Sequence, residues 1–135
     1  HVFKDEEKKL DHLLKQLALN HSFISYSDAV NKILNKAIDK PYITVSSDDG
    51  FKNNLRAAEI LDENGVKACF FVSPGIINNS DYETIKTFCR MRIKFPPVEF
   101  LNWNDIERLQ KMGHEIGSHT MDHINIAEAK IEKIK

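Results

Sequence analysis

The sequence predicts an α/β protein with a parallel sheet, because three short strand-like segments alternate with two amphipathic helical segments. The strand-like segments lie at residues 42–47, 66–73 and 114–118, and the helical patterns lie between them at 54–64 and 103–112. Parallel strands need a long crossover connection, which is usually a helix, so this order is typical of parallel α/β sheets and barrels.

A helical lead-in over residues 1–40 precedes the first strand. Residues 5–18 have the spacing of an amphipathic helix with leucines along one side, and residues 23–26 have the composition of a short strand. Ser27 begins a second predicted helix, which Lys40-Pro41 ends. The expected apolar stripe of this helix comprises Ala29, Val30, Ile33, Leu34, Ala37 and Ile38.

Turn residues bound the elements that follow. Residues 42–47, which include the β-branched run Ile43-Thr44-Val45, predict a buried strand that ends at Asp48-Asp49-Gly50. Gly65 ends the helix over 54–64. The nearly all-apolar residues 66–73 are typical of a parallel strand covered on both faces.

Residues 81–92 fit a further helix, and Phe95-Pro96-Pro97 requires a loop or extended backbone. Trp103 opens the next helix, Gly113 ends it, and the third strand over 114–118 follows directly.

The composition is that of one ordinary globular domain. The chain has 135 residues, of which 41% are hydrophobic and 29% charged, with a formal net charge of −1. This balance gives no support to a nucleic-acid or anionic-membrane partner, and no stretch approaches the roughly 18 apolar residues of a membrane span. Cys69 and Cys89 have no metal or redox spacing and leave the compartment undetermined, and Cys69 is expected to be a small core residue.

Two motifs carry the functional prediction. Asp48-Asp49-Gly50 follows the first strand, and His119-Thr120-Met121-Asp122-His123 follows the third. Taken alone, the first is most often a turn, and the second is more often a surface or inner-histidine pattern than a ligand pair on one face of a helical turn. Both lie at carboxyl ends of predicted strands, where α/β sheets and barrels place their chemistry. One carboxylate and two imidazoles can hold a catalytic metal and a second carboxylate can accept a proton, which together indicate metal-assisted hydrolysis.

These residues resemble the polysaccharide deacetylase family, the NodB-homology domain of carbohydrate esterase family 4. Residues 46–50 are similar to its motif Thr-Phe-Asp-Asp-Gly, with Ser47 in place of Phe, and residues 119–123 match its His-(Ser/Thr)-x-x-His motif. Residues 68–72 and 113–120 are also close to the family's sequence, and the resemblance covers about residues 3–126. It implies that residues 41–135 form the N-terminal portion of a distorted (β/α) barrel of the deacetylase type, without its C-terminal portion.

The resemblance assigns roles to four residues. It implies that Asp49, His119 and His123 bind one divalent metal, zinc in preference to cobalt, nickel or manganese, and that Asp48 is the general base. Asp48 and Asp49 share a site only if the chain turns there, which Gly50 permits. The family's later motifs, including the segment with the general acid, do not occur in this sequence. His114 is an acid candidate by residue type alone, and its position at a strand start indicates a structural histidine.

The leading hypothesis is a metal-dependent hydrolase that removes N-acetyl or O-acetyl groups from an amino-sugar polysaccharide. Two alternatives stay open: a catalytically impaired carbohydrate-binding or regulatory module on the same fold, and an amidase acting on non-polymeric C–N bonds. The chain ends inside a helical pattern over 131–135, so we expect a fragment with little activity alone. The rest of the barrel is expected from residues beyond Lys135, from another chain or by domain exchange at the open sheet edge.

Overall fold

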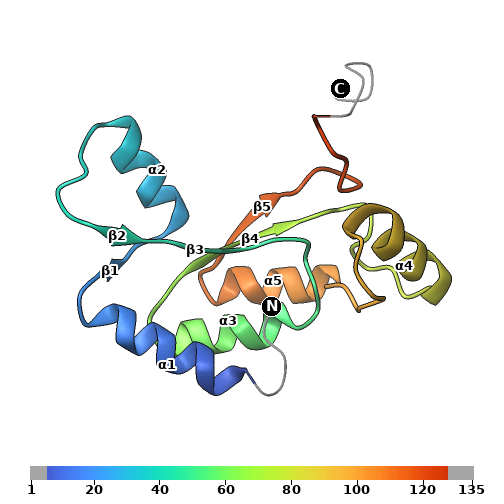
Figure 1. The fold of residues 1–135 in the computed structure, drawn as a ribbon, viewed down its shortest axis with the longest axis horizontal. Helices are drawn as coiled ribbons and strands as arrows, with labels where there is room; N and C mark the ends of the chain where they lie inside the picture. The colour runs from blue at the N-terminus through green and yellow to red at the C-terminus, as the bar shows by residue number, and fades with distance from the viewer. Residues whose placement is uncertain (1–5, 128–135) are drawn as a thin grey trace.

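The computed structural model describes residues 6–127 of the chain (Figure 1). The helical pattern expected over 131–135 lies outside the described residues. The elements in chain order are α1 (Glu7–Ala18), β1 (Ser22–Phe23), α2 (Tyr26–Leu34), β2 (Tyr42–Ile43), β3 (Val45–Ser47), α3 (Asn54–Glu63), β4 (Ala68–Val72), α4 (Tyr82–Phe88), the π-helical turn η1 (Cys89–Ile93), α5 (Trp103–Lys111) and β5 (Glu115–Ser118). None of the described helices is long and apolar enough to cross a membrane.

The central feature is a parallel sheet in the order β3-β4-β5, which confirms the α/β prediction. Helices α3 and α5 are the crossovers that follow β3 and precede β5, and they lie with α1 on one face of the sheet (Figure 1). The register places Cys69 of β4 beside Ser46 of β3 and Glu115 of β5. The carboxyl ends of β3 and β5 therefore lie on either side of the end of β4.

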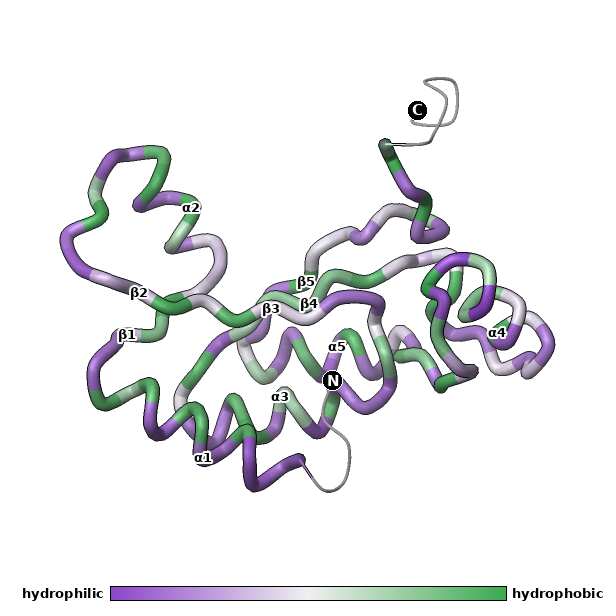
Figure 2. The backbone as a smooth tube through the Cα atoms, in the orientation of Figure 1, coloured by the Kyte–Doolittle hydropathy of each residue, from purple (hydrophilic) through white to green (hydrophobic). Residues whose placement is uncertain are grey.

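The hydrophobic core lies between this sheet and the three helices. Alternate residues of β4, namely Ala68, Phe70 and Val72, join the core cluster, because successive side chains of a strand point to opposite faces. Cys69 faces the other side and is 4% exposed, which confirms it as a buried residue. Figure 2 shows hydrophobic residues along β4 and again in the lobe that contains α2. We call the face of the sheet opposite α3 and α5 the inner face.

The prediction of one buried strand over residues 42–47 was wrong. The segment forms two short strands, because Tyr42 and Ile43 pair in parallel with β1, whereas Val45 to Ser47 pair with β4. All five strand residues keep some solvent exposure, and Ser46 is exposed. The chain changes partner at Thr44, and a pairing partner is a property of the tertiary fold rather than of the segment's own composition.

The second helix also differs from its prediction. It begins at Tyr26 and ends at Leu34 rather than at Lys40, and Lys36 follows with a φ of +53°. Its apolar stripe is not buried: Ile33 is 64% and Leu34 73% exposed. The helix docks on the inner face through its first turn instead, where Glu115 accepts hydrogen bonds from the Ser27 amide and hydroxyl and Tyr26 contacts Phe71 edge-on.

His114 is a structural histidine, as its position at the strand start indicates. His114 is 4% exposed, and the Nδ1 atom of its ring accepts a 3.2 Å hydrogen bond from the Ala68 amide. Nε2 therefore carries the proton and lies 3.2 Å from the Ala58 carbonyl oxygen, which can only accept. The imidazole thus joins β4 to α3. Burial lowers the pKa of His114, against the opposing effect of the Ala58 hydrogen bond.

This lowered pKa predicts a loss of stability in mild acid. The folded protein keeps His114 neutral, whereas the unfolded chain binds a proton near the ordinary histidine pKa of about 6.5. The unfolded state therefore binds more protons, and the free energy of unfolding should fall as the pH drops from 7 through 6.5 and level off below the folded pKa. Urea unfolding of the metal-free protein between pH 5 and pH 8 measures this slope.

The matched variant is His114→Gln, which has no titrating group. We expect this variant to be about 1–3 kcal/mol less stable at pH 7, because the buried backbone amide of Ala68 loses the Nδ1 acceptor of His114. Its stability curve should also be flatter below pH 7 than that of the unmutated protein. Parallel pH curves for the two proteins would contradict the assignment.

Candidate metal centre

Asp48, Asp49 and Gly50 form a tight turn at the end of β3. The Gly50 amide donates a 2.9 Å hydrogen bond to the Asp48 carbonyl oxygen, and Asp49 between them has a φ of +71°. This is a γ-turn with a positive central φ, which is rare and strained for a residue other than glycine. The chain does turn here, as a shared site for the two carboxylates requires, and the strained residue is Asp49, because glycine adopts a positive φ such as that of Gly50 without strain.

The surrounding structure holds this turn in place. The Leu101 amide donates to the Gly50 carbonyl oxygen at 2.9 Å, and the Lys52 amide donates to the Glu99 carbonyl oxygen at 2.8 Å. The rings of Phe51 and Phe100 pack edge-on with centroids 5.3 Å apart. Strained backbone persists only where surrounding contacts hold it in place. Here the contacts made by residues 99–101 hold the turn.

His119 enters the site directly from β5. Its amide donates a 2.8 Å hydrogen bond to the Val72 carbonyl oxygen, which continues the parallel ladder for one residue beyond the strands. The Ser73 hydroxyl donates to the His119 carbonyl oxygen at 3.2 Å. The end of β4 therefore fixes the backbone from which the His119 ring projects.

His119 and His123 are not on a helical turn, contrary to what the spacing suggested. The segment is irregular, and Thr120 and His123 have φ values of +63° and +50°. Thr120 Oγ1 accepts a 3.1 Å hydrogen bond from the Ile124 amide, which closes the loop. The two rings meet edge-on with centroids 4.7 Å apart. Loop geometry, rather than helical periodicity, brings the imidazoles together.

The loop that follows β4 buttresses this histidine segment. The Gly75 amide donates a 2.8 Å hydrogen bond to the Met121 carbonyl oxygen. A methyl group at Gly75 would overlap that oxygen and the Asp122 carboxylate, so the two loops approach more closely than any other residue type would allow.

Asp49, His119 and His123 converge on one point. Asp49 Oδ1 lies 3.5 Å from His119 Nε2 and 3.0 Å from His123 Nε2, and a ligand atom from each residue lies within 4.8 Å of the others. The Asp49 side chain is 13% exposed, and the two histidine side chains are 35% and 26% exposed. The group is thus shielded on the carboxylate side and open on the imidazole side.

The donor set fits a divalent metal. Two atoms about 2.0–2.1 Å from a tetrahedral zinc ion lie about 3.3 Å apart, close to both Nε2–Oδ1 separations. Asp49 Oδ1 is also buried without a hydrogen-bond partner among the described residues, although a ring nitrogen lies within hydrogen-bond distance. An acceptor that is buried and faces two imidazole nitrogens without a hydrogen bond is the arrangement expected around a shared cation.

Asp48 lies beside this group rather than within it. It is exposed, and it follows Ser46 on the inner face by the alternation of the strand. Burial is the main cause that raises the pKa of Cys69, and the negative charges of Glu115 and Asp48 add to it. The Asp48 carboxylate is therefore exposed to solvent and close enough to Cys69 to affect it electrostatically.

Asn54 is a buried polar residue that the sequence interpretation did not single out. It is fully buried at the start of α3, and its Oδ1 accepts a 3.1 Å hydrogen bond from the Ser47 hydroxyl. The departure at Ser47 from the family motif therefore creates a polar contact as well as removing an aromatic ring. An asparagine in a first helical turn resembles an ordinary cap, so the pattern contained no signal for this contact.

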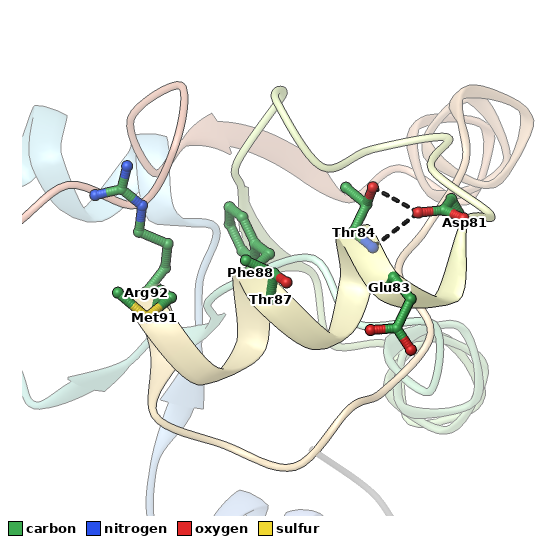
Figure 3. A pocket seen from close by; sticks show the side chains of 7 residues that line it. All are labelled: Asp81, Glu83, Thr84, Thr87, Phe88, Met91 and Arg92. Carbon is green, nitrogen blue, oxygen red and sulfur yellow. Dashed lines mark hydrogen bonds between the residues drawn. The ribbon is translucent and has the colours of Figure 1, made fainter.

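An open groove along α4 and η1 lies outside the candidate site. Figure 3 shows its lining, in which Phe88 and Met91 supply apolar surface and Asp81 accepts hydrogen bonds from the Thr84 amide and hydroxyl. Asp81 thereby caps α4, which confirms the helix expected near residues 81–92. None of the residues that line the groove belongs to the Asp49 group.

The family follows from a comparison with family models. The model described as Polysaccharide deacetylase matches residues 35–135. The chain belongs to the polysaccharide deacetylase family. The resemblance drawn from the two motifs is therefore confirmed. A comparison with curated proteins found no match.

Solved deacetylase structures share the fold of this polysaccharide deacetylase chain. The Streptococcus pyogenes deacetylase PplD, in complex with acetate, is 17% identical with a TM-score of 0.71, and the match covers 98% of this chain and 57% of PplD. IcaB from Ammonifex degensii is 21% identical (TM-score 0.68; 86% and 46% covered). A de-N-acetylase from Aggregatibacter actinomycetemcomitans is 18% identical (TM-score 0.67; 93% and 50% covered). The prediction of a segment of a deacetylase-type barrel is confirmed, and the chain spans about half the length of these structures.

Proposed function

We propose that this chain contributes the metal-binding part of a hydrolase that removes N-acetyl, or O-acetyl, groups from an amino-sugar polysaccharide. The observation that supports the proposal is the convergence of Asp49, His119 and His123, with Nε2–Oδ1 distances of 3.0 and 3.5 Å, in a member of the polysaccharide deacetylase family. The proposal concerns the full-length protein, because the chain spans about half of the solved deacetylases it matches.

Asp49 and the two histidines would hold one divalent metal, with zinc preferred over cobalt, nickel and manganese. When bound, such an ion lowers the pKa of a water and polarises the acetyl carbonyl. The protein residues around the ion would set its charge environment and its access to solvent. Asp49 supplies the negative charge, and the buried side of its carboxylate keeps bulk water away from one face of the group. The exposed edges of His119 and His123 leave the other face open for substrate.

Asp48 would act as the general base. Its carboxylate is exposed beside the group, so it can accept the proton of the attacking water as the water adds to the acetyl carbon. The turn at Asp49 is what allows two consecutive carboxylates to serve one site, because residues of a regular strand would point to opposite faces. We expect the general acid to come from a part of the full-length protein other than these residues.

Acetate release by the full-length protein tests this function. We expect release from acetylated chito-oligomers when the protein is loaded with zinc, loss of release after chelation, and recovery when zinc is restored. Simple amides should react far more slowly. Binding of the oligomers without acetate release would favour a carbohydrate-binding or regulatory module instead, and faster reaction with small amides than with oligomers would favour an amidase.

A further inference from the structure

The contact between Ser47 and Asn54 spans the base of the loop that carries the two aspartates. Ser47 is the last residue of β3 and Asn54 is the first residue of α3. The hydroxyl of Ser47 donates to Asn54 Oδ1 at 3.1 Å, on the side of the strand that faces the core. Only six residues separate the two partners, and they include Asp48 and Asp49.

This contact is poorly explained as a contribution to stability. Asn54 is 0% exposed, and its Nδ2 has no hydrogen-bond partner among the described residues. A buried donor without an acceptor carries a desolvation cost, and replacing both members of such a polar pair by apolar groups of similar shape is close to neutral for stability. The buried residues one turn further along α3, such as Ala57 and Ala58, are apolar. Stability alone would therefore favour an aliphatic side chain at position 54.

The loop itself needs the constraint that the contact supplies. Asp49 has a φ of +71°, which is uncommon for a residue other than glycine and costs free energy that surrounding contacts must offset. Residues 99–101 hold the outer part of the turn through Gly50 and Lys52. The Ser47–Asn54 hydrogen bond holds the two ends of the loop together on the core side.

We propose that Ser47 and Asn54 form a positioning pair that presents Asp49, and with it Asp48, to the metal. This inference rests on the proposed metal site. Groups that orient a metal ligand without touching the metal change metal affinity by about 10–100-fold when they are removed. The pair therefore contributes to metal affinity more than to the stability of the metal-free protein.

Metal titrations of three variants of the full-length protein test the pair. Asn54→Leu and the double variant Ser47→Ala with Asn54→Leu should bind zinc about 10–100-fold more weakly than the unmutated protein, at unchanged stoichiometry. The metal-free unfolding midpoint of the double variant should stay close to the unmutated value, because it replaces both members of the polar pair. With cobalt as the probe, the visible absorption spectrum should shift, because the Asp49 oxygen moves. Ser47→Ala removes one oxygen atom and should weaken binding in the same direction, which keeps the test decisive if the Leu variants do not fold.

The matched control is Asn64→Leu at the other end of α3. Asn64 donates hydrogen bonds to Asp11 and to the Ile60 carbonyl oxygen, so its loss should lower the unfolding midpoint but leave zinc affinity and the cobalt spectrum unchanged. Variants at Ser47 and Asn54 with unaltered zinc affinity and an unaltered cobalt spectrum would overturn the positioning pair alone. An unmutated protein that takes up no metal would instead overturn the metal site, and the role of the pair with it.

Discussion

Replacing His123 with alanine should remove most of the metal from the purified full-length protein. The substitution leaves Asp49 and His119 as ligands, and a catalytic zinc site needs three protein ligands to retain its ion. The loss of affinity should therefore exceed the roughly 10–100-fold that follows the loss of a residue that only orients a ligand. Asp49→Ala and His119→Ala should have effects of the same size, because each removes one member of the same group.

Metal content per chain and competition with a chromophoric chelator measure this effect. The matched control is His12→Ala, which removes an exposed imidazole from α1 on the helix-covered face of the sheet. The control should keep the metal content and affinity of the unmutated protein. Unchanged metal content and affinity across the variants at positions 49, 119 and 123 would eliminate the proposed centre.

Replacing Asp48 with asparagine should reduce acetate release by about 10²–10⁴-fold, the usual consequence of losing a general acid or base. Asparagine keeps the size of the side chain and removes its ability to accept the proton. Metal affinity should change little, because Asp48 is outside the group that Asp49 forms with the two histidines. A large loss of turnover with retained metal distinguishes a base from a ligand.

Turnover and zinc affinity are measured on the same preparations, with Glu115→Gln as the control. Glu115 is another carboxylate near Cys69 on the inner face, where it caps the first turn of α2. Removing its charge should leave turnover within a few-fold of the unmutated value. Unmutated turnover in the Asp48→Asn protein would show that a different group takes the proton.

The sequence pattern was sufficient for elements whose burial is set by their own periodicity. The apolar run of β4 and the helix boundaries at Gly65 and Gly113 appear in the structure close to their predicted positions. These elements bury a face defined by their own side chains, so local spacing contains the needed information. The role of His114 followed in the same way, because an imidazole at the start of a buried strand must find partners.

Elements that depend on a neighbour were predicted less well. Residues 42–47 look like one strand, but the chain changes its pairing partner at Thr44. The residue types of such a segment do not specify which strand it will pair with. The apolar stripe of α2 stays exposed because the helix attaches to the sheet through Tyr26 and Ser27. A hydrophobic pattern states that a face can be buried, and the remainder of the fold determines whether it is.

The candidate metal centre was likewise predictable in part: its residues could be proposed from the sequence, but their arrangement could not. Residue types and their positions after two strands indicated His119, His123 and one carboxylate of the Asp48-Asp49 pair, because parallel strands end at one edge of a sheet and imidazoles and carboxylates are metal donors. The choice of Asp49 as the ligand came from the family resemblance. The convergence of these three residues depends on positive φ angles at Asp49 and His123, which are uncommon at non-glycine residues and which the spacing of the motifs does not predict. The buried contact of Ser47 with Asn54 likewise required the folded structure, since neither residue is distinctive until β3 and α3 are packed together.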